Sequence, residues 1–205
     1  MPVRGYEPSD LRALAHLHRR AFPGSTLARL GPDVVARYLG SQLALDEVEG
    51  LVVGPVGEPV AALVGGRFGR GTSRFVRDHA GLLVASVLRH PSVLVRSRSS
   101  VARRVGASAL VRRRRGPERP DRVPEGSYGV LLLAVDPDQQ RRGLGRVLVD
   151  AAAGSARRRG LDRLHLTVDP TDTAARSFYE GLGFVRLDPD GDAPRAWLLG
   201  KDLGP

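Results

Sequence analysis

The chain has 205 residues and a net charge of +10, with 41% hydrophobic and 26% charged residues. This length and composition predict one globular domain with a substantial core and exclude a disordered chain. The absence of cysteine excludes disulfides, thiolate metal sites and a cysteine nucleophile. The first residues lack the apolar core of a signal peptide, and no apolar run approaches the ~20 residues that cross a bilayer. We therefore expect a cytoplasmic protein.

The positive charge is concentrated in one segment. Residues 67–125 contain 15 arginines and four acidic residues, a net charge of +11, so the remainder of the chain is close to neutral. Pieces compatible with helices come first in this segment, and the proline-rich run "GPERPDRVPEG" follows them. We expect a basic helical insertion inside a single domain that spans residues 1–205.

Before this segment, the hydrophobic pattern predicts a strand, two helices and a hairpin. The strand is expected at 3–6, and a helix follows to about residue 22, with Ser9 or Asp10 accepting hydrogen bonds from first-turn amides. A second helix is expected over about 32–45, because proline suits a first turn. Two β-rich runs, 51–54 and 59–67, flank a turn. His18 lies on the apolar stripe of the first helix, and we expect a buried histidine with satisfied hydrogen bonds.

After the segment, strand and helix patterns alternate. The run "YGVLLLAV" (128–135) is almost wholly apolar, as in a strand buried on both faces. A helix is expected over 143–159, with Gly160 as its C-terminal cap. A strand (161–168), a short helix (about 173–182) and two strands (184–187 and 195–199) complete the chain.

The run "DPDQQRRGLG" joins the apolar strand to the following helix. A turn and a helix start present unpaired backbone amides and the positive end of the helix dipole, which suits a pyrophosphate. Gly143 and Gly145 leave room for a phosphate, and Arg141, Arg142 and Arg146 add positive charge. Taken alone, the pattern also fits a plain helix start with solvated arginines.

Two motifs resemble the GNAT superfamily of N-acetyltransferases. "QRRGLG", residues 140–145, matches Q/R-x-x-G-x-G/A, and "DTAARSFYEGLGF", residues 172–184, is similar to N-x-x-A-x-x-F-Y-x-x-x-G-F. The resemblance covers 1–66 and 126–205. It implies an α+β fold with a mixed sheet flanked by helices, which splays open after its fourth strand. The basic segment would be an insertion between the third and fourth strands.

The resemblance also implies acetyl-CoA as the cofactor and no metal. The backbone of Leu133, Ala134 and Val135 would pair with the pantetheine arm. Tyr179 stands at the position of the family's general acid. Asp172 replaces an asparagine and cannot donate a hydrogen bond, so helix N-capping is its favoured role. The remaining cofactor-binding positions are Gln140, Arg141, Arg142, Gly143, Leu144, Gly145 and Arg146.

The implied reaction is transfer of the acetyl group to a primary amine by direct attack in a ternary complex. An amino sugar, a peptide or a protein amine could be the acceptor. The alternative is a non-catalytic scaffold that holds CoA or docks on a membrane or nucleic acid. Glu125, Tyr128 and His165 are candidate general bases, and deprotonation through water needs none of them.

Three roles are open for the basic insertion, 67–125. It could lie on the anionic inner face of a membrane, close over an anionic acceptor as a lid, or pack on the domain or on a second copy in a homodimer. Nucleic-acid binding is disfavoured, because only Phe68 and Phe75 interleave the basic run.

Overall fold

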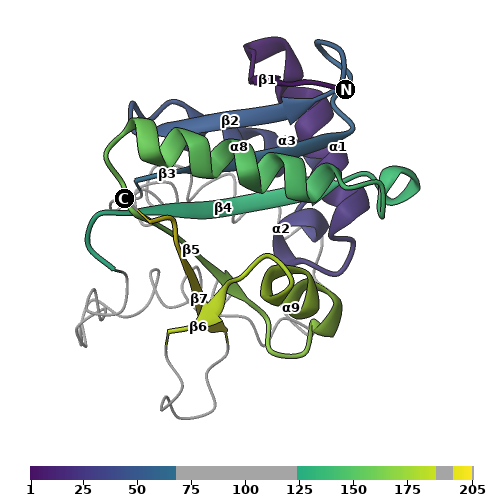
Figure 1. Cartoon of the computed structure of the whole chain (residues 1–205). Helices are drawn as coiled ribbons and strands as arrows, with labels where there is room; N and C mark the ends of the chain where they lie inside the picture. The colour runs from purple at the N-terminus through teal and green to yellow at the C-terminus, as the bar shows by residue number, and fades with distance from the viewer. Residues whose placement is uncertain (68–123, 188–195, 205) are drawn as a thin grey trace, which may run out of the picture.

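The computed structural model describes residues 1–67, 124–187 and 196–204. The insertion expected over 67–125 lies outside these ranges, apart from Arg67, Pro124 and Glu125. The described chain contains a seven-stranded sheet in the order β1-β2-β3-β4-β5-β7-β6 (Figure 1). Only β4 and β5 pair in parallel, so the sheet is mixed, as predicted. In these ranges, no helix is both long and apolar enough to cross a bilayer.

The N-terminal half contains the predicted elements β1 (Val3–Gly5), α1 (Leu11–Ala21), α3 (Pro32–Leu43), β2 (Val48–Val53) and β3 (Ala61–Gly66). Strand β2 begins three residues before the predicted start, because Val48 pairs with Gly66 across the hairpin. A short helix, α2 (Thr26–Arg29), was not predicted. Four residues are too few for a hydrophobic period, and only the Ser25 side chain, which accepts from the Ala28 amide at 3.0 Å, marks its start.

The C-terminal half also follows the predicted order. It comprises β4 (Ser127–Val135), α8 (Leu144–Arg158), β5 (Arg163–Val168), α9 (Thr173–Glu180), β6 (Val185–Arg186) and β7 (Trp197–Asp202). Gly160 has φ +69° directly after α8, which confirms its predicted capping conformation. Strand β7 continues three residues past its predicted end, because it pairs with β5 along the whole of that strand.

Helices cover the two faces of the sheet (Figure 1). Helices α1 and α3 pack on one face, against a core that includes Val52, Val64 and Leu132. Helices α8 and α9 pack on the other, where Leu164 and Leu166 of β5 contribute to the core. Since side chains alternate along a strand, Arg163, His165 and Thr167 of β5 face away from α8.

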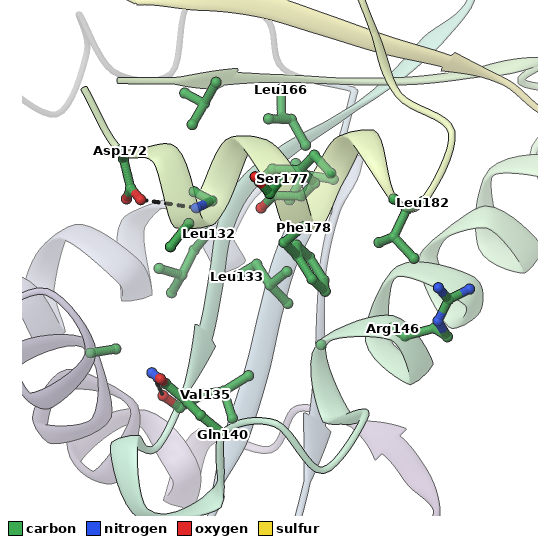
Figure 2. A pocket seen from close by; sticks show the side chains of 18 of the residues that line it. Leu132, Leu133, Val135, Gln140, Arg146, Leu166, Asp172, Ser177, Phe178 and Leu182 are labelled. Carbon is green, nitrogen blue, oxygen red and sulfur yellow. Dashed lines mark hydrogen bonds between the residues drawn. The ribbon is translucent and has the colours of Figure 1, made fainter. Parts of the chain in front are cut away.

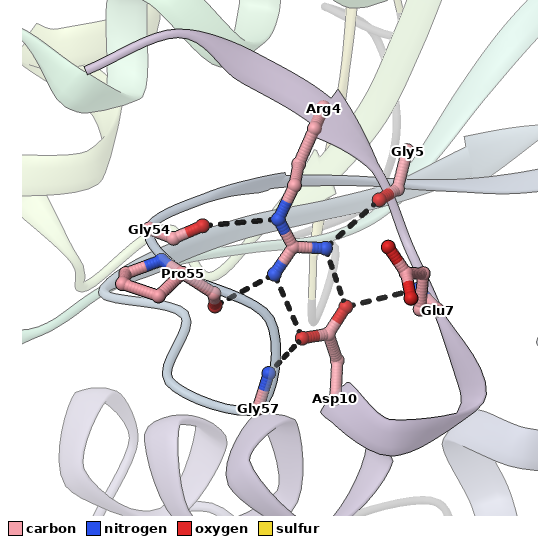
Figure 3. A network of polar contacts seen from close by, with 7 residues as sticks. All are labelled: Arg4, Gly5, Glu7, Asp10, Gly54, Pro55 and Gly57. Atoms are coloured by element: carbon pink, nitrogen blue, oxygen red, sulfur yellow. Dashed lines mark hydrogen bonds and ion pairs between the residues drawn. The ribbon is translucent and has the colours of Figure 1, made fainter.

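A partly buried ion pair joins β1 to the start of α1 and to the β2–β3 turn (Figure 3). Asp10 is fully buried and accepts two hydrogen bonds from Arg4, at 2.7 and 2.8 Å. It also accepts from the Glu7 and Gly57 amides, at 2.9 and 2.8 Å. The expectation that Ser9 or Asp10 caps the first turn of α1 is therefore wrong, because this carboxylate binds Arg4 and amides outside the helix.

The sheet opens between its two parallel strands, as the resemblance predicted. Strands β4 and β5 pair only from Ser127↔Arg163 to Gly129↔His165, although β4 runs on to Val135 and β5 to Val168. The β3–β4 register shifts at the same level: Val64 faces Leu132 and Gly65 faces Val130, so Leu131 is an extra residue in β4. Such a bulge bends the strand and increases its twist, so it helps β4 leave β5.

Candidate functional site

A pocket of about 800 Å³ fills the gap between β4 and β5. This is within the usual range for small-molecule sites. Side chains of β4, of α9 and of the segment before α8 converge on it (Figure 2). Phe22, at the end of α1, lines it from one face of the sheet, and Phe178 and Tyr179 of α9 line it from the other. The pocket therefore reaches both faces through the gap.

One end of the pocket lies at the start of α8. Arg141 has φ +60° and Gly143 has φ +80°, two left-handed residues separated by one. Alternation of this kind is typical of a backbone nest, in which successive N–H groups turn toward one side and can bind an anion. The first amides of α8 have no intrahelical partners and add the positive end of the helix dipole. A Cβ at Gly143 would meet no heavy atom within 4 Å, so this backbone is open to an approaching group.

At Gly145 the structure shows a second reason for a small residue, besides the room for a phosphate that we expected. A Cβ at this position would lie 3.0 Å from Cζ and 3.3 Å from Cε2 of Phe178. The first turn of α8 therefore packs directly against the Phe178 ring, which points from α9 toward Leu133 and the helix start (Figure 2). Gly145 allows α8 and α9 to approach closely at the mouth of the gap.

An ion-pair clamp holds the segment that leads into the nest. Arg20, in the last turn of α1, contacts Asp136 at 2.8 Å and Asp138 at 2.8 Å through its two terminal nitrogens. The Asp136 side chain in turn accepts from the Asp138 amide at 3.0 Å. The Gln140 side chain donates to the Val135 carbonyl at 3.3 Å. Helix α1 and the end of β4 thus both fix this turn.

Tyr179 lies in the pocket wall, half-buried between two other rings. Its ring makes edge contacts with Phe178 and Phe184, with centroids 5.1 and 5.4 Å apart. Burial, with a smaller contribution from the negative charge of Asp172, raises the pKa of Tyr179 to about 12. The hydroxyl is therefore protonated at neutral pH and available as a hydrogen-bond donor.

Most of the predicted cofactor residues line this one pocket. Leu133, Val135 and Asp172 are in its wall, together with Gln140, Arg141, Gly143, Leu144, Gly145 and Arg146. Ala134 is buried toward α1 and α3, and Arg142 is exposed beside the pocket without lining it. Asp172 accepts from the Ala175 amide at 2.9 Å, as expected of a helix N-cap (Figure 2).

The candidate bases do not line the pocket. Tyr128 is fully buried and donates to Glu49 at 2.9 Å; burial raises its pKa, so it is a core residue. Glu125 is exposed in the turn before β4. His165 is the last residue of β5 that pairs with β4, at the point where the gap opens.

The expectation for His18 is half right. Its side chain is buried, with 7% of the residue exposed, and burial lowers its pKa to about 4. Its Nδ1, however, has no hydrogen-bond partner in the described part of the chain, so the expected satisfied histidine is not present there. In the same ranges, no group of three or more histidine and acidic side chains could hold a metal ion.

Sequence reasoning missed the pocket wall contributed by other elements. Phe22, Leu131, Thr167 and Ser177 all line the gap, yet no motif marks them. Arg20 was likewise missed, because its two acidic partners lie more than 110 positions away in the chain. Phe22 and Arg20 reach the site because α1 packs beside the end of β4, and the other three line it because β4 and β5 separate next to α9.

The sequence is similar to known acetyltransferases in the part of the chain that contains most of the pocket residues. Residues 103–184 match the profile described as "Acetyltransferase (GNAT) family". A curated relative, mycothiol acetyltransferase of Beutenbergia cavernae, is 45% identical over 65 residues, which are 31% of this chain and 22% of the relative. The chain thus spans about a fifth of the length of the curated relatives it matches.

Solved structures of similar fold cover almost the whole chain. The ribosomal-protein-S18-alanine N-acetyltransferase of Escherichia coli has a TM-score of 0.56 at 19% identity and covers 98% of this chain and 93% of its own. The PaiA N-acetyltransferase of Thermoplasma acidophilum, solved with coenzyme A, has a TM-score of 0.59 at 12% identity and covers 98% of both chains. Residues 103–184 are therefore similar to the acetyltransferase (GNAT) family, and the described chain shares the fold of these solved acetyltransferases.

Proposed function

We propose that this chain is an acetyl-CoA-dependent N-acetyltransferase that acts on a primary amine. The observation that carries the proposal is the gap between β4 and β5, which has an amide nest at one end and Tyr179 in its wall. Acetyl-CoA would lie in this gap, with its pyrophosphate at the start of α8 and its pantetheine arm along Leu133 to Val135. The apolar lining of β4 and α9 suits that arm.

Strand β4 would bind the reacting thioester. Beyond Gly129 its edge toward β5 is unpaired, because the two strands have separated. Backbone N–H groups on this edge are fixed by β3 pairing on the other side of the strand. An N–H aimed at the thioester oxygen stabilises the negative charge that develops during attack, a contribution often worth about 3 kcal/mol.

Tyr179 would assist the leaving group. A phenol with a pKa of about 12 releases its proton reluctantly. Its first role is therefore to donate a hydrogen bond to the developing thiolate. It would then pass a proton to sulfur as it takes one from the attacking nitrogen, which is positively charged once the N–C bond has formed.

The acceptor would enter from the face of the sheet covered by α1. Phe22 and Thr167 line the pocket on this side, opposite the α9 residues. Because the gap reaches both faces, the amine and the acetyl-CoA can occupy it from opposite sides and react directly, without an acyl-enzyme.

The test is release of free thiol from acetyl-CoA in the presence of a panel of amines. The panel contains amino sugars, polyamines and a peptide with an N-terminal alanine. It also includes the acceptor of the mycothiol acetyltransferases. Tyr179→Phe is expected to lower kcat by about 10- to 100-fold. Tyr6→Phe is the matched control, because Tyr6 packs against Gly50 of β2 and does not line the pocket. Tight CoA binding without thiol release from any amine would favour the non-catalytic scaffold.

The basic insertion, 67–125, has its own test. If it attaches the protein to the inner face of a membrane, the chain will sediment with anionic vesicles at low salt and much less at high salt. Vesicle binding that is absent, or that does not change with salt, removes this role and leaves the lid and the packing arm.

A further inference from the structure

A hydrogen-bonded chain fixes the imidazole of His165 where β4 and β5 separate. The Ser127 hydroxyl donates its proton to the Pro124 carbonyl, and its oxygen lies 2.8 Å from His165 Nδ1. A hydroxyl has one proton, so Ser127 can only accept from the imidazole. Nδ1 therefore carries the imidazole proton, and Nε2 presents a lone pair. Ser127 is 7% exposed, which makes this a built contact and not a solvated one.

The register of β5 puts the His165 side chain on the face of the sheet from which the acceptor would enter. Gly129↔His165 is the last pair between the two strands, so His165 lies at the apex of the gap. Its side chain faces away from α8, on the same face as Thr167, which lines the pocket. Two residues along a strand span about 7 Å. His165 does not itself line the pocket, and it lies about this distance along β5 from Thr167, which does.

We propose that His165 is the general base that takes a proton from the acceptor amine, and that Ser127 is the positioning residue that holds its tautomer. The inference rests on the proposed acetyl transfer. Described residues leave Nε2 without a hydrogen-bond partner. Burial lowers the pKa of His165, so the imidazole is neutral and able to accept at pH 7.

The protons balance in three steps. The acceptor enters as an ammonium ion, and one of its protons passes to His165 Nε2. The free amine attacks the thioester carbon, so an N–C bond forms as the C–S bond breaks. A second proton leaves the nitrogen for sulfur by way of Tyr179, and the third remains on the amide. The products are the acetylated amine, CoA thiol and a histidinium ion that returns its proton to water.

No unbalanced charge in the described part faces this imidazole. On the same face of the sheet, Arg163 pairs with Asp202 of β7, and these two charges offset each other. Lys201 pairs with Leu164 and so faces the α8 side. Glu125 is exposed in the turn before β4. The lowered pKa of His165 has burial as its cause, and these groups leave that direction unchanged.

The test is the pH dependence of kcat/KM, measured by thiol release with the best amine of the panel. With His165 present, activity is expected to rise through a pKa below the ordinary imidazole value and then stay level. In His165→Gln, only the free amine can react, so activity is expected to fall about 100-fold at pH 7 and to rise tenfold per pH unit toward the amine pKa. Ser127→Ala, which keeps the imidazole but frees its tautomer, is expected to lose about 10-fold.

His16→Gln is the matched control, because this histidine is exposed on α1 and outside the pocket. CoA affinity, measured by calorimetry, is expected to be unchanged in all three variants. If His165→Gln folds, binds CoA and keeps the wild-type pH profile, the assignment is wrong while the acetyltransferase proposal stands. If the wild-type chain releases no thiol with any amine, both proposals fail.

Discussion

The anion nest at the start of α8 can be tested with two glycines of the same helix. Gly143 precedes α8 with φ +80°, and Gly160 follows it with φ +69°. A Cβ at either position would meet no heavy atom within 4 Å. The two substitutions to alanine therefore differ in one respect: only Gly143 adjoins the pocket.

The expected effects on stability and on CoA binding follow from this comparison of Gly143 with Gly160. An L-residue in the left-handed region costs about 1 kcal/mol more than glycine, so Gly143→Ala and Gly160→Ala are expected to lower the free energy of unfolding by similar amounts. At Gly143 the new methyl group also enters the space where a pyrophosphate would contact the backbone. A loss of one such contact weakens CoA binding at least tenfold, which corresponds to about 1.4 kcal/mol.

Urea unfolding measures the first quantity, and titration calorimetry with CoA measures the second. We expect both variants to unfold at lower urea, and only Gly143→Ala to lose CoA affinity. Equal CoA affinity in the two variants would refute a nest at the start of α8. A loss of affinity in both would show that helix strain, and not phosphate contact, controls binding.

Three further outcomes are expected. Hydrogen bonds from Arg4 are the main cause that lowers the pKa of the Asp10 carboxyl to about 2. The contribution of this carboxylate to stability is therefore complete above pH 4 and is lost as pH falls from 4 to 2. In urea unfolding, Asp10→Asn is expected to lower the free energy of unfolding by about 3 kcal/mol at pH 7 and by much less at pH 2. Arg20→Gln, which removes two partly exposed ion pairs, is expected to raise the KM for acetyl-CoA about threefold, whereas Arg19→Gln on the same helix leaves it unchanged. The raised pKa of Tyr179 predicts that kcat shows no loss from its ionisation up to about pH 10, and an earlier loss that disappears in Tyr179→Phe would contradict this.

The sequence by itself determined the order of the strands and of the longer helices, and it predicted a phosphate site at the start of α8. Local signals were sufficient there, because the apolar run of β4 predicts a strand, and Gly143 and Gly160 mark the two ends of α8 through backbone conformations that other residues disfavour. The predicted burial of β4 on both faces holds only in part, since Val130, Leu131, Leu133 and Val135 are partly exposed in the gap. The Asp172 cap was also readable, because a capping side chain bonds an amide three residues away.

Only the tertiary structure decided which residues share the gap. Gly145 matched a phosphate motif, and the structure adds a close contact with Phe178, which belongs to a helix more than 30 positions later. Asp10 resembled a helix cap, but Arg4 and the β2–β3 turn bind its carboxylate. The packing of α1 beside β4 places Arg20 and Phe22 at the gap. The pairing of β4 with β5 brings Ser127 to His165. Contacts between elements distant in sequence depend on the packing of whole helices and strands, and no local pattern of residues records that packing.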